Sequence, residues 1–157
     1  MTIYEKIAQD HETHTDLLDR LVDTSGDSKE RELLWNNFYY DVKAHAAAEE
    51  ETFYSKLIET QAGQPDARHS IHEHHKLEKL MEELHEMDFS SPVWLKKFKQ
   101  LKHDYLHHME EEEDQVFTKA KAQLGGDIQS KLGDRFESRK ENEFELVDRK
   151  VEISLEH

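Results

Sequence analysis

The sequence predicts an all-α fold: an up-down-up-down four-helix bundle with a C-terminal fifth helix. Only five glycines and two prolines interrupt its 157 residues, so its secondary-structure elements should be long. Apolar residues make up 35% of the chain and charged residues 36%, a balance that suits amphipathic helices better than a wide sheet core. Apolar side chains recur at helical spacing in four successive segments, and the short connections between these segments favour antiparallel neighbours.

The first two predicted helices have inner faces that mix apolar residues with histidine. Thr2 and Glu5 have the spacing of a capping box, so the first helix should begin after Thr2. Its inner face contains Ile3, Ile7, His11, His14, Leu18 and Leu21. The polar stretch 23–28 should end it, and the second helix is expected from about Lys29 to Glu59. The inner face of the second helix contains Leu34, Phe38, Val42, His45, Glu49 and Phe53.

Two further helices complete the predicted bundle. Gly63 and Pro65 should separate the second helix from a third. The inner face of the third helix contains Ala67, Ile71, His74, Leu77, Met81 and Leu84. Ser91 and Pro92 predict the N-cap and the first residue of a fourth helix. The inner face of the fourth helix contains Trp94, Phe98, Leu101, Tyr105, His108, Glu112 and Val116.

The chain is expected to divide into a bundle, a charged extension and a short remnant. The bundle should span residues 1–124, because a Gly-Gly pair then closes the fourth helix. Residues 125–154 predict a highly charged fifth helix, for which a solvated cap or a partly frayed tail is the alternative interpretation. Three of its apolar residues are available to dock on the bundle: Ile128, Leu132 and Phe136. Residues 155–157 resemble the start of an expression tag.

Composition excludes several classes of function. Cysteine is absent, which removes disulfides, iron–sulfur clusters, thiolate zinc sites and thiol catalysis. The formal net charge of -15 argues against nucleic acid or an anionic membrane as a partner, because both would repel the chain. No apolar run approaches a membrane span, and Glu5 and Asp10 interrupt the region where a signal peptide would be apolar. A cytoplasmic protein is therefore expected.

An internal repeat selects particular histidines and glutamates from the inner faces. A shift of 63 residues superposes three pairs: His11 and His74, His45 and His108, Glu49 and Glu112. The same shift places Leu77 on His14, so the repeat does not retain His14. Each half should form a helical hairpin that contributes one histidine from its first helix and a His-x-x-x-Glu pair from its second. His107 and Glu111 are rotated away from the inner face by about a quarter turn.

Two inward glutamates require an explanation, because buried carboxylates repel each other and lose hydration unless cations lie between them. Together with four imidazoles they predict a dimetal centre. Nitrogen and oxygen ligands without sulfur suit iron, manganese or zinc. The predicted metal ligands are His11, His45, Glu49, His74, His108 and Glu112. The outer glutamates are expected to form a solvated acidic face: Glu50, Glu51, Glu110, Glu111 and Glu113.

Five segments of the chain resemble the haemerythrin-like proteins of the bacterial HHE type. They are QDH ending at His11, HAAAEEETFY, EHHKLEKLMEEL, HHMEEEEDQVF and GDRFESRK, and they cover nearly the whole chain. The resemblance implies a non-haem di-iron bundle whose two iron ions (Fe2+/Fe3+) share an oxo or hydroxo bridge. It implies that the four selected histidines are terminal ligands and that Glu49 and Glu112 bridge the irons. The implied partner is O2 or a similar small ligand, such as NO or peroxide.

One departure from the oxygen-carrying haemerythrins of marine worms affects the expected function. Those proteins have a further histidine where this chain has Ser70, and an aspartate where it has Glu113. Six ligands for two irons leave more open coordination than a carrier needs. The first hypothesis is therefore a protein that binds or senses a small ligand, or handles iron. The second is a di-iron enzyme that decomposes peroxide or NO or repairs iron centres, with His14, Tyr105 or Tyr54 as candidate proton donors. The third is a metal-free acidic helical module that binds basic partners.

Overall fold

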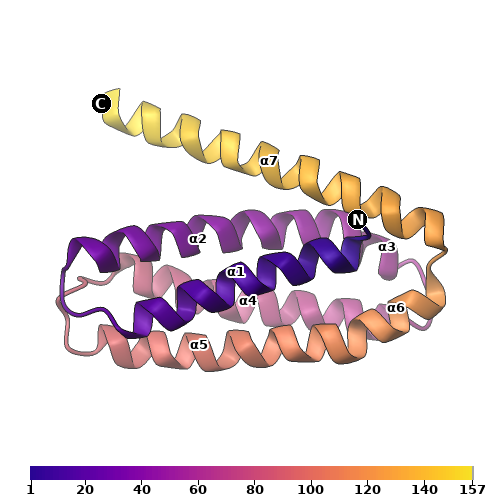
Figure 1. The fold of residues 1–157 in the computed structure, drawn as a ribbon, viewed down its shortest axis with the longest axis horizontal. Helices are drawn as coiled ribbons and strands as arrows, with labels where there is room; N and C mark the ends of the chain where they lie inside the picture. Colours follow the sequence, from indigo (N-terminus) through magenta and orange to yellow (C-terminus); the bar gives the residue numbers. More distant parts are fainter. Residues whose placement is uncertain (157) are drawn as a thin grey trace.

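The computed structural model describes the backbone of residues 1–156 and the side chains of residues 1–146. This part of the chain is helical without strands, which confirms the all-α prediction (Figure 1). The elements in chain order are α1 (Ile3–Val22), α2 (Lys29–Glu49), the π-helix η1 (Glu50–Tyr54), α3 (Ser55–Leu57), α4 (Gln64–Glu86), α5 (Trp94–Glu111), the π-helix η2 (Glu112–Val116), α6 (Phe117–Gln123) and α7 (Gly126–Glu156). Because α2, η1 and α3 follow one another without a break, as do α5, η2 and α6, four rods form the bundle and α7 is the fifth helix.

The helix ends agree with the sequence signals in most places. Thr2 caps α1: its hydroxyl accepts a hydrogen bond from the Glu5 N–H, and the Glu5 carboxylate accepts one from the Thr2 N–H. The predicted start of the fourth helix was wrong by two residues, because Ser91 and Pro92 lie in a turn that the Trp94 N–H closes by donating to the Ser91 carbonyl. The second rod ends at Leu57 rather than at Glu59.

The core consists of two apolar clusters at opposite ends of the bundle. The first cluster includes Leu18, Trp35, Phe38, Leu84, Trp94 and Phe98. The second includes Ile3, Ile7, Phe53, Tyr54, Leu57 and Phe117. On each rod the predicted metal ligands lie in sequence between members of these two clusters. The two clusters therefore place the polar layer in the middle of the bundle.

Helix α7 packs against α1 and α2 (Figure 1). Leu132 and Phe136 are buried on the bundle, as predicted, whereas Ile128 is 37% exposed and does not dock. Ion pairs between Lys6 and Glu137 and between Arg139 and Glu51 join the helix to the bundle at its rim. Of the three residues of the predicted tag remnant, residue 157 lies outside the described residues and the side chains of the other two are not described.

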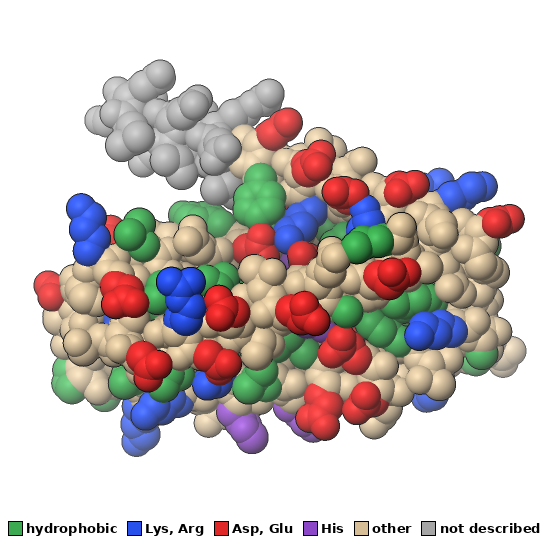
Figure 2. All heavy atoms as spheres, viewed as in Figure 1, with side chains coloured by type: hydrophobic (Ala, Val, Ile, Leu, Met, Phe, Trp, Pro, Cys, Tyr) green, Lys and Arg blue, Asp and Glu red, His purple; other side chains and the backbone are tan. Residues whose placement is uncertain are grey.

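The surface is strongly acidic. Figure 2 shows many aspartates and glutamates over the visible face of the bundle, with fewer lysines and arginines among them, in keeping with the formal net charge of -15. Among the described residues, no helix combines the length and the apolar character needed to cross a membrane.

Candidate metal centre

The structure brings all six predicted ligands together in the middle of the bundle. They come from four different rods, and each residue is at most 8% exposed. Their potential ligand atoms form two groups, in each of which the atoms lie within 4.8 Å of one another. The first group contains His11, His45, Glu49 and Glu112, and the second contains Glu49, His74, His108 and Glu112. Both glutamates therefore belong to both groups.

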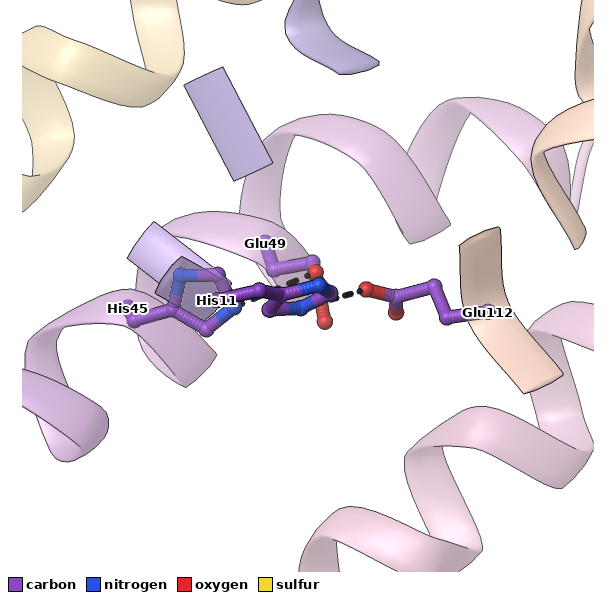
Figure 3. Close-up of side chains that lie close together, drawn as sticks. All are labelled: His11, His45, Glu49 and Glu112. Carbon is purple, nitrogen blue, oxygen red and sulfur yellow. Dashed lines mark ion pairs between the residues drawn. The ribbon is translucent and has the colours of Figure 1, made fainter. Parts of the chain in front are cut away.

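Each glutamate lies between two imidazole Nε2 atoms from different rods. The Glu49 oxygens are 3.3 Å from Nε2 of His45 and 2.9 Å from Nε2 of His74. The Glu112 oxygens are 3.2 Å from Nε2 of His11 and 3.7 Å from Nε2 of His108. Figure 3 shows the first group, in which the Glu112 side chain points at the other three from the opposite side of the bundle. All four histidines thus direct Nε2 at the shared carboxylates.

Several polar atoms in this layer are buried without a hydrogen-bond partner. They are both ring nitrogens of His11, both carboxylate oxygens of Glu49 and one carboxylate oxygen of Glu112. The short distances given above are therefore close approaches that lack hydrogen-bond geometry. A buried polar group without a partner typically costs about 1–3 kcal/mol, and a charged one costs more. Cations between these atoms would supply the missing partners, so the residues present fit a metal centre.

A second layer of carboxylates faces the Nδ1 atoms of the four histidines. Each histidine has one such neighbour: Asp10 at 2.8 Å from His45, Glu50 at 3.2 Å from His74, Glu73 at 3.2 Å from His108, and Glu113 at 3.7 Å from His11. A carboxylate at the outer nitrogen fixes the tautomer and the orientation of a metal-binding imidazole. The assignment of Glu50 to a solvated face was therefore incomplete, whereas Glu113 is exposed as predicted and lies beyond hydrogen-bonding distance of His11. The repeat itself contained the signal, since the shift of 63 residues also superposes Asp10 on Glu73 and Glu50 on Glu113.

The pKa values of the two central glutamates are shifted in opposite directions. Burial raises the pKa of Glu112 well above its usual value, and the adjacent Glu49 carboxylate raises it further. Burial also raises the pKa of Glu49. The neighbouring His45 and His74 lower it by more, so the pKa of Glu49 is held well below its usual value. The Tyr54 hydroxyl also donates a hydrogen bond to Glu112. Two carboxylates that share a buried site separate their pKa values in this way, because they cannot both ionise without a compensating charge.

A π-helical turn lies at each of the two inward glutamates. Helix α2 becomes η1 directly after Glu49, and η2 begins at Glu112. Such turns are rare and occur often at functional sites, where the extra residue in the turn rotates the following side chains. Apolar periodicity does not predict these turns, because both segments keep an apolar pattern that is compatible with an uninterrupted α-helix.

Helix α7 supports the centre from outside the bundle. The Phe136 ring packs against the His45 ring with 5.5 Å between centroids. The Lys140 ammonium lies 2.9 Å from Asp10, whose other oxygen is the neighbour of His45. Burial raises the pKa of Asp10, but His45 and Lys140 outweigh it and lower the pKa to about 2. The fifth helix therefore keeps ionised the carboxylate that orients a predicted metal ligand.

A cavity of about 220 Å³ leads from the surface to this centre. It opens between α2 and α4, where Lys43, Glu78 and Glu143 line it. Its inner wall includes three of the predicted ligands and the buried Tyr105: His45, His74, His108 and Tyr105. The structure thus provides an access route that sequence periodicity cannot reveal, because a cavity depends on how side chains of different helices meet.

His14 lies beside the centre but outside both groups of potential ligands, as the repeat predicted. Its Nε2 lies 2.5 Å from Asp41 and its Nδ1 lies 2.8 Å from the Tyr105 hydroxyl. A neutral ring satisfies both contacts, with Nε2–H donating to Asp41 and Nδ1 accepting from Tyr105. Burial lowers the pKa of His14 to about 4. The ring is therefore held neutral at neutral pH.

This lowered pKa predicts a loss of stability in acid. In the unfolded chain His14 takes up a proton as the pH falls through 6.5, whereas in the folded chain it does so only near pH 4. The free energy of unfolding should therefore fall between these pH values, by about 3 kcal/mol from this residue. We expect His14→Gln to unfold with a shallower pH dependence in this window in denaturant titrations. The control is His103→Gln, which changes an exposed histidine. Equal pH dependence in the parent and in His14→Gln would contradict a neutral buried ring.

Comparisons with known proteins agree with the all-α fold and with a cation-binding protein. The family model "Hemerythrin HHE cation binding domain" matches residues 2–120. A curated relative, a DNA nickase of Nostoc sp., is 25% identical over 140 residues, which are 89% of this chain and 39% of that protein. The chain thus spans about two fifths of the length of this relative. A solved structure of a Hemerythrin HHE cation binding domain-containing protein from Mycobacterium kansasii has a TM-score of 0.85 at 19% identity, over 97% of this chain and 93% of that one.

Proposed function

The chain belongs to the hemerythrin HHE cation-binding domain family, and from this premise we propose that it is a non-haem di-iron protein that binds or senses a small ligand or handles iron. The proposed ligand is O2, NO or peroxide. Members of the family bind metal cations, and the chain has a buried group of histidines and glutamates that fits such cations. The identity of the metal as iron and the number of two ions are parts of the proposal.

One observation carries the proposal: two groups of potential ligands share both of their glutamates. A carboxylate with one oxygen near each of two cations can bridge them, and two such bridges suit a pair of ions better than one ion. In this arrangement Glu49 and Glu112 would bridge. His11 and His45 would complete the first metal position, and His74 and His108 would complete the second. Iron held there would supply the redox chemistry and the ligand binding.

The protein's own residues would control which molecules reach the centre. The cavity of about 220 Å³ is smaller than the about 300–1,000 Å³ of typical pockets for larger organic ligands. Val42, Leu77 and Met81 give it apolar walls above the polar layer. Ser70, at the place of the additional histidine in oxygen carriers, is buried and leaves one potential ligand fewer. These features favour a small ligand that binds directly to the metals.

A second candidate function is a di-iron enzyme that decomposes peroxide or NO or repairs iron centres. The observation that favours it is the position of Tyr105, which lines the cavity and whose hydroxyl is joined to His14 and through it to Asp41. A chain of hydrogen-bonding groups of this kind can supply a proton to a bound molecule. Sustained turnover of peroxide or NO by the iron-loaded protein would favour the enzyme over the binding protein. Nicking of DNA is not proposed, because a chain with a net charge of -15 repels a phosphate backbone.

The proposal predicts about two iron ions per chain, by the bridging logic above. Protein loaded with ferrous iron under nitrogen and then desalted should contain this amount by metal analysis. Addition of NO or O2 should then change its absorption spectrum. The proposal fails if the purified protein holds one zinc ion per chain that iron does not replace.

A further inference from the structure

Two exposed His-x-x-x-Glu pairs lie side by side outside the buried centre. One pair is His69 and Glu73 on α4, and the other is His107 and Glu111 on α5. Both repeat the local pattern of the buried pairs but face solvent, since the side chains of His69 and His107 are 53% and 69% exposed. The proposed di-iron centre uses neither histidine.

Donor atoms of His69, Glu73 and Glu111 converge on one place, and His107 lies beside Glu111. His69 Nε2 is 3.3 Å from a Glu73 oxygen on its own helix and 3.1 Å from a Glu111 oxygen on the neighbouring helix. His107 Nε2 lies 3.6 Å from the other Glu111 oxygen. One potential ligand atom from each of His69, Glu73 and Glu111 lies within 4.8 Å of the others. Glu73 and Glu111 are only 20% and 22% exposed, so helix packing holds both carboxylates near their positions.

These separations match a metal coordination shell. Nitrogen and oxygen ligands at about 2.0–2.2 Å from a tetrahedral Zn2+ ion are about 3.3–3.6 Å from one another. Isolated histidine–glutamate ion pairs at a surface contribute little to stability. Such pairs also do not explain why carboxylates from two helices approach the same imidazole nitrogen. A divalent cation would satisfy the donors of His69, Glu73 and Glu111 together.

We propose that His69, Glu73 and Glu111, with the neighbouring His107 as a fourth donor, form a second, solvent-accessible site that binds Zn2+ in preference to Fe2+. This site does not depend on the proposed function of the buried centre. The two are nevertheless in contact through Glu73, whose Oε1 atom is 3.3 Å from His69 Nε2 and 3.2 Å from Nδ1 of His108. A cation on Glu73 is therefore held directly beside a predicted ligand of the buried centre.

Zinc binding to matched histidine variants tests the proposal. Glu73 is unsuitable for the test because it also contacts His108, whereas His69 and His107 are exposed and their loss leaves the core intact. The control is His75→Ala, which removes an exposed histidine of α4 that belongs to neither pair. Zn2+ alone is the probe, measured by equilibrium dialysis and metal analysis. The backgrounds are the parent chain and the Glu49→Gln, Glu112→Gln double variant, in which the proposed bridges are removed.

In the parent background we expect His69→Ala to bind one Zn2+ ion fewer per chain than His75→Ala. In the double-variant background one Zn2+ ion per chain should remain, and His69→Ala or His107→Ala should weaken its binding by at least about tenfold. Equal zinc binding in His69→Ala and His75→Ala would overturn the proposal, and so would the absence of zinc from the double variant. If the double variant does not fold, the comparison in the parent background decides. If zinc binding depends on His69 but the buried centre takes up no iron when ferrous iron is supplied, the proposed function is refuted and this site stands.

Discussion

Replacement of both Glu49 and Glu112 by glutamine is expected to abolish the rise in melting temperature that ferrous iron gives to the parent protein. The change removes the two bridging carboxylates, so iron should no longer bind the folded state in preference to the unfolded one. The metal-free double variant should be at least as stable as the metal-free parent, because glutamine fills the same space without charge. In the metal-free parent, burial and the neighbouring Glu49 already raise the pKa of Glu112.

The raised pKa of Glu112 also determines how the rise in melting temperature caused by iron depends on pH. Glu112 keeps its proton in the folded chain above the pH at which an unfolded glutamate loses it, so its contribution to stability declines as the pH rises through the raised pKa. Iron must displace this proton. The rise in melting temperature of the parent should therefore be larger at neutral pH than in acid. His45 and His74 hold Glu49 ionised, so Glu49 does not add an opposite trend in this window.

Thermal melts of both proteins under nitrogen, with and without ferrous iron, measure these effects. The parent should gain stability from iron and the double variant should not. A double variant that gains as much from iron as the parent would show that these glutamates are not bridges. A metal-free double variant much less stable than the metal-free parent would instead show that Glu49 and Glu112 stabilise the fold without metal.

The register of the inner faces was predictable from the sequence because each face repeats a strong signal over several turns. His11, His45, Glu49 and Glu112 were placed inward by the spacing of large apolar residues around them, and all are buried in the structure. The internal repeat then excluded His14 as a metal ligand. The periodicity of the first helix alone places both His11 and His14 on the inner face and cannot choose between them. Helix α7 was harder to predict: Leu132 and Phe136 dock as expected, but Ile128, in the first turn of the helix, is 37% exposed.

Features that depend on contacts between helices could not be derived in this way. Glu50 is adjacent to the inward Glu49, and helical spacing alone turns it towards solvent. Instead, the packing of α4 against this part of the second rod places His74 Nδ1 3.2 Å from the Glu50 carboxylate. The start of α5 was misplaced because Ser91-Pro92 has the composition of a helix start but forms a turn. The cavity has no sequence signature, since residues of α2, α4, α5 and α7 line it together.

His108→Ala should lose iron from the buried centre, whereas His107→Ala should retain it. The two histidines are adjacent in sequence but lie in different environments: the His108 side chain is 4% exposed and that of His107 is 69% exposed. His108 Nε2 lies 3.2 Å from His74 Nε2 and 3.7 Å from a Glu112 oxygen. Loss of this ligand would leave the second metal position with one imidazole, so its affinity for iron should fall by at least about tenfold.

The experiment loads both variants and the parent with ferrous iron under nitrogen, removes excess metal and measures iron per chain. The melting temperature of each metal-free variant shows whether the bundle has folded, so that iron loss through unfolding is recognised. His107→Ala should match the parent in iron even though it weakens zinc binding at the exposed site, because His107 Nε2 points to Glu111 and away from the polar layer. Comparable iron loss in His108→Ala and His107→Ala would mean that both histidines are needed for the same iron site. In that case His108 and Glu112 would no longer define a separate position for the second iron.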